Sequence, residues 1–152
     1  MKNEATKVSG GCLCEDIRYE AEVFLKGGSY CHCRICQKSS GAPAEIGIPI
    51  KAGSLRFIKG EPTYYQTSEY GKRGFCGNCG SRVLWKAVDP AYDWCTNVSV
   101  GSLDTSADAR PSNHIYTDTQ LPWYQVADSL PKYRREDMEQ VMKVWQRERN
   151  IT

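Results

Sequence analysis

Hydrophobic and polar residues alternate along several short stretches of the chain, and a period of two is typical of half-buried strands. The clearest stretch alternates charged residues with four apolar ones, Ile17, Tyr19, Ala21 and Val23. Further strands are predicted within residues 45–50, 55–57, 63–70, 83–85, 94–100 and 114–116. Because turns rich in glycine and proline separate these stretches, we expect a mainly β domain of antiparallel strands. Residues 71–74 contain two glycines and predict a hairpin-like turn.

The two ends of the chain follow different patterns. Residues 1–10 predict a short disordered lead-in. Near the other end, apolar side chains recur at helical spacing on a charged background and predict an amphipathic helix over residues 134–149: Met138, Val141, Met142 and Trp145. We therefore divide the chain into a domain over residues 8–131 and a helical extension over residues 132–152. Such a helix packs on its own domain or on a second copy, so a homo-oligomer is one expectation.

The bulk composition narrows the function classes. The 152 residues suffice for one ordinary domain, and the net charge of +2 comes without any basic block. We therefore expect no nucleic-acid partner. The sequence contains no apolar run of membrane-spanning length and no signal-peptide pattern at its start, so we expect no membrane partner and a cytoplasmic location.

The eight cysteines are the most informative residues. Clustered cysteines in a reducing compartment are more often metal ligands than disulfides, whereas a disulfide framework would require a secreted protein. Their spacing agrees with metal binding. Two Cys-x-Cys pairs and two Cys-x-x-Cys pairs occur, at Cys12 and Cys14, Cys31 and Cys33, Cys33 and Cys36, and Cys76 and Cys79.

Seven of these thiols divide into a group of four and a group of three. Cys12, Cys14, Cys76 and Cys79 form two pairs that can complete a tetrahedral, structural zinc site. The remaining group, Cys31, Cys33 and Cys36, can cover one side of a second zinc ion and leave its fourth position open, as catalytic zinc sites do. Zinc with three thiolates is a weak Lewis acid that suits a thiol substrate, because coordination lowers the pKa of the thiol.

Several other assignments stay open at this stage. His32 could supply a fourth ligand, although its neighbours on both sides are expected ligands. Cys95 could do the same, or it could be a small buried hydrophobic residue. An iron–sulfur cluster is a third alternative, but the cysteine spacings do not match the ferredoxin patterns.

The motifs together resemble one known family. Gly11-Cys12-Leu13-Cys14, the run from Cys31 to Cys36 with Ser40-Gly41-Ala42-Pro43, and Arg73-Gly74-Phe75-Cys76-Gly77-Asn78-Cys79-Gly80 are similar to the glutathione-dependent formaldehyde-activating enzymes, which share their domain with the centromere protein V family. The segments Pro111–Tyr116 and Leu121–Trp123 resemble the closing motif of that family. Two departures are Glu15, where the family usually has glycine, and a shorter chain than that of the enzymes for which the family is named.

The resemblance implies a β-tent type of fold with two zinc ions. It assigns the structural ion to Cys12, Cys14, Cys76 and Cys79, and the catalytic ion to Cys31, Cys33 and Cys36. The implied activity is that of a carbon–sulfur lyase that joins glutathione and formaldehyde into S-hydroxymethylglutathione. Its partners would be a small thiol and a small aldehyde.

Two hypotheses follow from the sequence. In the first, the three-cysteine zinc site is catalytic, with His32, Tyr30 and Ser40 as candidates for handling the proton because they are close in sequence. In the second, both zinc ions are structural and the protein is a binding or scaffold module. The second hypothesis requires a fourth protein ligand for the second zinc ion.

Overall fold

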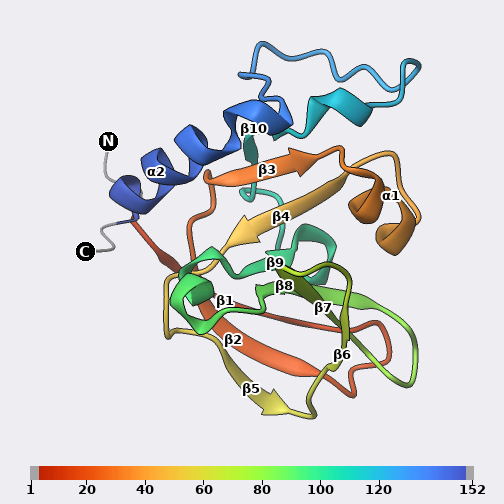
Figure 1. Cartoon of the computed structure of the whole chain (residues 1–152). Coiled ribbons are helices and arrows are strands. Elements are labelled where there is room, and N and C mark those ends of the chain that lie inside the picture. The colour runs from red at the N-terminus through yellow and green to blue at the C-terminus, as the bar shows by residue number, and fades with distance from the viewer. Residues whose placement is uncertain (1–3, 150–152) are drawn as a thin grey trace.

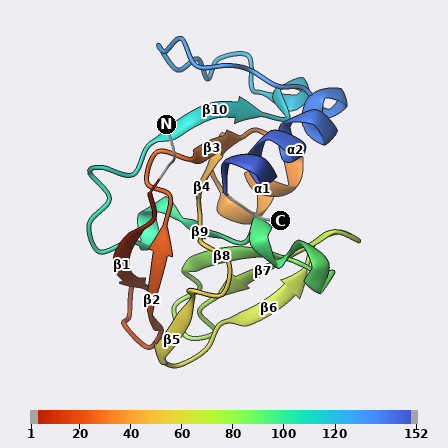
Figure 2. The ribbon, with the colours of Figure 1, turned by 90° about the vertical axis from the view of Figure 1, so that its left-hand side faces the viewer.

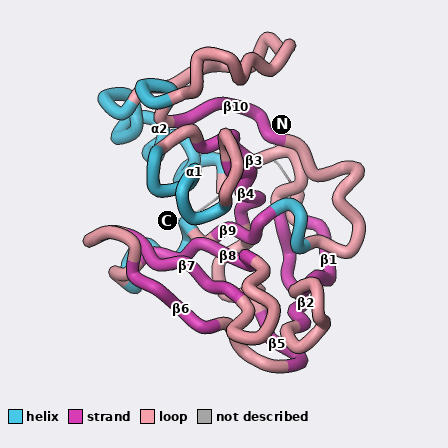
Figure 3. The backbone as a smooth tube through the Cα atoms, turned by 90° about the vertical axis from the view of Figure 1, so that its right-hand side faces the viewer, coloured by secondary structure: helices cyan, strands magenta, loops and turns pink. Residues whose placement is uncertain are grey.

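The computed structural model describes residues 4–149 as two β-sheets with two α-helices and short 3-10 turns (Figure 1). The strands are β1 Thr6–Gly11, β2 Arg18–Val23, β3 Gly28–Cys31, β4 Glu45–Pro49, β5 Arg56–Lys59, β6 Thr63–Gln66, β7 Gly71–Phe75, β8 Arg82–Ala87, β9 Asn97–Ser99 and β10 Pro111–Ile115. The helices are α1 Arg34–Ser40 and α2 Met138–Glu148. Strands and loops make up most of the backbone (Figure 3), so the predicted mainly β class is confirmed.

The strands form a small sheet and a large one (Figure 2). The small sheet has the order β1-β2-β5, and the large sheet has the order β10-β3-β4-β9-β8-β7-β6. Every pairing is antiparallel except that of β10 with β3, which is parallel. The expected antiparallel architecture therefore holds for all pairs but this one. The exception is important because it places the end of β10 beside Cys31.

Apolar side chains from both sheets make one hydrophobic core. Tyr19 and Val23 of the small sheet are fully buried, as are Ile48, Leu84 and Val98 of the large sheet. Burying one large apolar side chain stabilises a fold by about 1.5–3 kcal/mol. This core fixes the positions of the strand ends, and the turns that carry the cysteines emerge from those ends.

The expected disordered lead-in is wrong for the described part of that segment. Residues 6–11 form β1, which pairs along its whole length with β2 and aligns Val8 with Ala21. Its pattern is hard to detect because Val8 is its only large apolar residue. Backbone pairing and the close packing of Gly10 against Tyr19 hold the strand, since a Cβ on Gly10 would lie 2.5 Å from the Tyr19 hydroxyl.

The expected turn at residues 71–74 is also wrong. These residues begin β7, and the turn lies before them, where the Ser68 hydroxyl accepts hydrogen bonds from two backbone N–H groups. The two glycines serve close packing instead of a turn. A Cβ on Gly71 would lie 2.4 Å from the Trp85 indole nitrogen, and one on Gly74 would lie 2.9 Å from Leu84.

The alternating run at residues 94–100 is only partly a strand. Residues 90–95 form a 3-10 helix that begins after Asp89, whose side chain accepts a hydrogen bond from the Ala91 N–H. The Asp-Pro pair favours this helical turn because proline at a first helical position loses no hydrogen bond. Only the three residues of β9 join the sheet.

The predicted C-terminal helix is confirmed as α2, preceded by a 3-10 turn at residues 135–137. Met138 and Val141 are buried within the same chain, and the Arg149 guanidinium lies 5.7 Å from the ring centre of Trp94. Self-association through this helix stays a prediction. Among the described residues, no helix combines the length and apolar character needed to cross a bilayer.

Candidate metal centres

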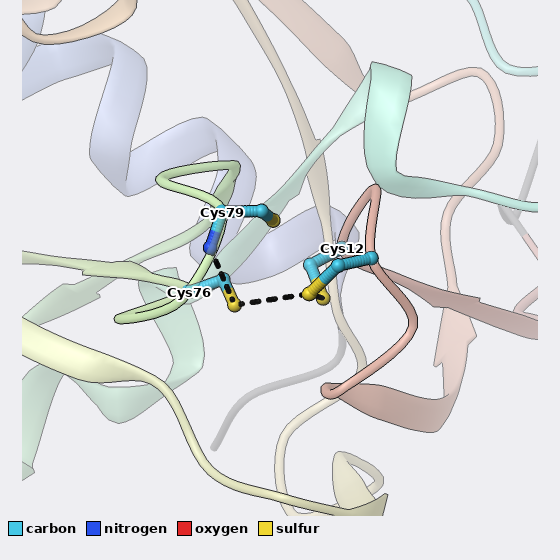
Figure 4. A group of neighbouring side chains, drawn as sticks. Cys12, Cys76 and Cys79 are labelled. Carbon is cyan, nitrogen blue, oxygen red and sulfur yellow. Dashed lines mark hydrogen bonds between the residues drawn. The ribbon is translucent and has the colours of Figure 1, made fainter.

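Four cysteines from two distant turns meet at one point, and Figure 4 labels three of them, Cys12, Cys76 and Cys79. Cys12 and Cys14 lie in the turn between β1 and β2, and Cys76 and Cys79 lie between β7 and β8. Their sulfur atoms are all within 4.8 Å of one another. The Cys14 sulfur lies 3.6 Å from that of Cys12 and 3.7 Å from that of Cys76. Zinc–sulfur bonds of about 2.3 Å in a tetrahedron require sulfur separations of about 3.8 Å, so this first cluster fits zinc.

Hydrogen-bond donors surround the sulfurs of this first cluster. The Ile17 N–H donates to the Cys12 sulfur at 3.2 Å, and the Asn78 N–H donates to the Cys76 sulfur at 3.4 Å. Hydrogen bonds from Ser81 lower the pKa of Cys79 to about 5. Donors of this kind favour thiolates, which are the form that binds a metal.

Glu15 shapes the first of these two turns. Its φ is 66°, in the left-handed region that glycine usually occupies, and its N–H donates to the Cys12 carbonyl at 3.2 Å. A non-glycine residue in this conformation costs about 1–2 kcal/mol. The turn nevertheless brings Cys12 and Cys14 to the other pair, so Glu15 does not disperse the four sulfurs.

The second cluster consists of Cys31, Cys33 and Cys36, whose sulfur atoms also lie within 4.8 Å of one another. Cys31 ends β3, and Cys36 lies in the first turn of α1. Cys33 is the residue before that helix, and its sulfur accepts a hydrogen bond from the Cys36 N–H at 3.3 Å. A helix starting at this point folds the chain back sharply. The helix α1 could not be predicted from the sequence, because seven residues are too few for a clear helical pattern.

As free thiols, these three groups share their protons unequally. Hydrogen bonds from Cys31 and Cys36 lower the pKa of Cys33 to about 2. Hydrogen bonds to Cys33 and Cys36 raise the pKa of Cys31 well above its usual value. A metal cation bound by the three sulfurs would displace the protons that the free thiols still carry.

The two residues considered as a fourth ligand both lie elsewhere. His32 is fully buried, and its Nε2 hydrogen-bonds Nδ1 of His114 at 2.8 Å. Cys95 lies near Arg149 at the C-terminal helix, and burial raises the pKa of its thiol to about 11. Among residues 4–149, no histidine, cysteine or acidic side chain joins the three thiols of the second cluster.

The structure also places the sequence-based candidates for proton transfer. Tyr30 stacks on His114, with 4.6 Å between the ring centres, and His32 hydrogen-bonds the same ring. Ser40 donates its hydroxyl proton to the Cys36 carbonyl at 2.7 Å. Tyr30 and His32 thus both contact His114, and Ser40 contacts the backbone of α1.

Residues at the end of β10 and just after it hold the second cluster from the other side, and no sequence pattern indicated this role. The Ile115 carbonyl accepts from the His32 N–H at 3.0 Å, and the Thr119 hydroxyl donates to the His32 carbonyl at 2.9 Å. The Gln37 amide bridges the His32 and Thr119 carbonyls. The contacts that Thr119 makes with His32 and Gln37 span more than eighty positions in the sequence, so no local pattern could reveal them.

Tyr116 is another residue that the sequence did not single out. It follows Ile115, the partner of Cys31 in the sheet, and its φ of 54° is unusual for a residue with a side chain. Burial raises the pKa of Tyr116, and the charge of Cys31 adds to the shift. The backbone thus places Tyr116 directly after the sheet partner of Cys31, at the edge of the second cluster.

Two packed sheets with one cluster of four thiols and one of three define a mainly β protein whose side chains can hold two zinc ions. Comparison with protein families agrees. The family model described as glutathione-dependent formaldehyde-activating enzyme matches residues 7–119. The chain therefore belongs to this family.

A crystal structure of a Rhodobacter sphaeroides protein has a similar fold. It superposes with a TM-score of 0.51 at 20% sequence identity, and the alignment covers 82% of this chain and 98% of that one. At this identity the likeness concerns the fold alone. The comparison with curated proteins finds no match.

Proposed function

We propose that this protein is a zinc-dependent enzyme of the carbon–sulfur lyase type, similar to S-(hydroxymethyl)glutathione synthase, that acts on the adduct of a thiol and a small aldehyde. The observation that carries the proposal is the three-cysteine cluster without a fourth protein ligand among residues 4–149. Membership of the formaldehyde-activating family supports the choice of glutathione and formaldehyde. The four-cysteine cluster is assigned to a structural ion that joins the two sheets.

The chain's own residues have distinct tasks in this proposal. Cys31, Cys33 and Cys36 would bind zinc, which supplies a Lewis acid with a position free for a thiolate or a carbonyl oxygen. During adduct formation the thiol loses its proton, its sulfur bonds to the carbonyl carbon, and the carbonyl oxygen gains a proton as the C=O π bond opens. Electrons balance without an oxidant. We assign the hydrogen bond to that oxygen to the Tyr116 hydroxyl.

A cytoplasmic location is part of the same proposal. All eight cysteines are free in the structure. Thiols stay reduced in the cytosol, where glutathione keeps disulfides from forming. The same compartment would supply a glutathione-like thiol.

The runner-up function is a scaffold with two structural zinc ions. It needs a fourth protein ligand at the second cluster, and the positions of His32 and Cys95 count against both named candidates. X-ray absorption of the zinc-loaded protein separates the two functions. In the enzyme, seven cysteine sulfurs are shared by two zinc ions, which gives an average of about 3.5 sulfurs per zinc and no other protein ligand. In the scaffold, the second zinc ion has a fourth ligand from the protein.

Activity is tested by following the exchange of labelled formaldehyde into the glutathione adduct by NMR. Cys33→Ala should reduce the rate to the uncatalysed level, and Cys95→Ala, outside both clusters, should leave it unchanged. Tyr116→Phe should lower the rate at least tenfold without changing the zinc count. Equal rates for the wild-type protein, Cys33→Ala and the buffer would refute the enzyme hypothesis.

A further inference from the structure

A buried guanidinium group contacts the second cluster from β7, a strand of the same large sheet as β3. Arg73 lies on β7, is 5% exposed, and donates from Nη2 to the Cys36 sulfur at 3.1 Å. Its Nη1 donates to the Thr67 hydroxyl. Burying a charged guanidinium costs several kcal/mol unless a partner compensates for the lost water. A buried Arg73 therefore requires a partner that can carry negative charge.

No carboxylate supplies that compensation in the described part of the chain. None of the ion pairs found there includes Arg73. Glu45, a carboxylate close to Cys36, is already paired with Arg82 at 2.7 Å. The Cys36 sulfur is then the one partner of Arg73 in these residues that can carry a negative charge. A zinc ion with three thiolates has a net charge of about −1, which one guanidinium balances.

We propose that Arg73 is a positioning residue of the three-cysteine metal site: its guanidinium orients the Cys36 sulfur and balances the negative charge of the metal–thiolate group. The inference rests on the metal site in the proposed function, but not on the identity of the thiol or the aldehyde. A hydrogen bond to a metal-binding atom fixes the orientation of that ligand and tunes the properties of the metal. Loss of such a hydrogen bond typically lowers metal affinity or activity by about 10–100-fold.

The position of Arg73 in the chain also links the two clusters. Three residues after it, the same segment supplies Cys76 to the first cluster. The pairing of Gly74 with Leu84 and of Phe75 with Arg82 fixes the strand between these two points. A metal held by the first cluster therefore restrains the strand that presents Arg73 to Cys36.

Arg82 offers a matched control. It is also a largely buried arginine on the neighbouring strand β8, and it also contacts the region of α1, through hydrogen bonds to Ser39 at 2.8 Å and Glu45 at 2.7 Å. Its hydrogen-bond partners are oxygen atoms, not a cysteine sulfur. Replacing Arg82 disturbs the same part of the fold without removing the hydrogen bond to the metal site.

The experiment compares the full-length wild-type protein with Arg73→Gln, Arg73→Lys and Arg82→Gln. Each is loaded with cobalt(II) and titrated with a chelator, while metal per chain and the sulfur-to-cobalt charge-transfer band are recorded. We expect Arg73→Gln to keep the first metal and to hold the second at least tenfold more weakly. Its charge-transfer band should move to longer wavelength, because the sulfur lone pair loses a donor.

Arg73→Lys should recover part of the affinity, since lysine restores the charge but not the planar geometry. Arg82→Gln should bind both metals as the wild type does. The proposal is overturned if Arg73→Gln matches the wild-type affinity and spectrum, or if Arg82→Gln weakens the second metal equally. Arg73→Lys provides the comparison if Arg73→Gln does not fold. A protein that shows these metal effects but no adduct formation refutes the proposed reaction and leaves the role of Arg73 intact.

Discussion

The Nε2 atom of His32 lies 2.8 Å from Nδ1 of His114, although 82 residues separate the two histidines. The other ring nitrogen of His114 faces the Asp128 carboxylate at 3.0 Å. An ionised carboxylate only accepts, so His114 carries its proton on Nε2 and receives the His32 N–H on Nδ1. This chain of hydrogen bonds explains why His32, although flanked by two cysteines of the second cluster, turns its ring away from them.

His114→Phe tests the strength of this connection. The phenyl ring can keep the stacking on Tyr30, but it leaves the fully buried His32 N–H without an acceptor. An unsatisfied buried donor costs about 1–3 kcal/mol, so we expect the free energy of unfolding of the zinc-loaded protein in urea to fall by about 2 kcal/mol. Asp108→Asn, at an exposed acidic residue, is the control. A loss below about 0.5 kcal/mol would show that the bond contributes little.

Zinc removal should destabilise the fold mainly through the first cluster. That cluster ties the β1–β2 turn of the small sheet to the β7–β8 turn of the large one, and metal binding of this kind adds directly to folding free energy. Cys79→Ser should reduce zinc from two ions per chain to one and lower the free energy of unfolding by about 3 kcal/mol or more. Elemental analysis and urea unfolding measure both quantities.

Cys95→Ala is the matched cysteine variant for that experiment, because Cys95 belongs to neither cluster. It should retain two zinc ions and lose no more than about 1 kcal/mol. If Cys79→Ser kept both ions and full stability, the four cysteines would not form the structural site that we assign to them.

The sequence predicted those features that local spacing determines. Alternation predicted β2 and β4, and the spacing of the cysteine pairs predicted which sulfurs would meet. Features that depend on distant partners were missed or misassigned. The strand β1 depends on pairing with β2, and the glycines of β7 pack against Trp85 and Leu84. The contact of Arg73 with Cys36 joins residues 37 positions apart on different elements, so neither local sequence contains a sign of it.

A final prediction concerns alkaline pH and the core residue Tyr19. Its hydroxyl is fully buried and lies 2.7 Å from the Ser102 hydroxyl, which donates its own proton to the Ser99 carbonyl. The Tyr19 hydroxyl therefore donates to Ser102. Burial raises the pKa of Tyr19 from 10.0 to about 12. The unfolded chain loses this proton first as the pH rises above about 10, so the stabilisation is complete below pH 10 and is lost as the pH rises towards 12.

Tyr19→Phe isolates this effect from the titration of the cysteines. At pH 7 the variant should be less stable than the wild type by about 1 kcal/mol, because one buried hydrogen bond is lost. Between pH 9 and pH 11 the wild-type protein should lose about 1.4 kcal/mol more than the variant, the value of one pKa unit. Urea unfolding of both zinc-loaded proteins across this range measures the difference. Parallel curves for the two proteins would mean that the Tyr19 phenol titrates normally in the folded state, and the burial argument would then fail.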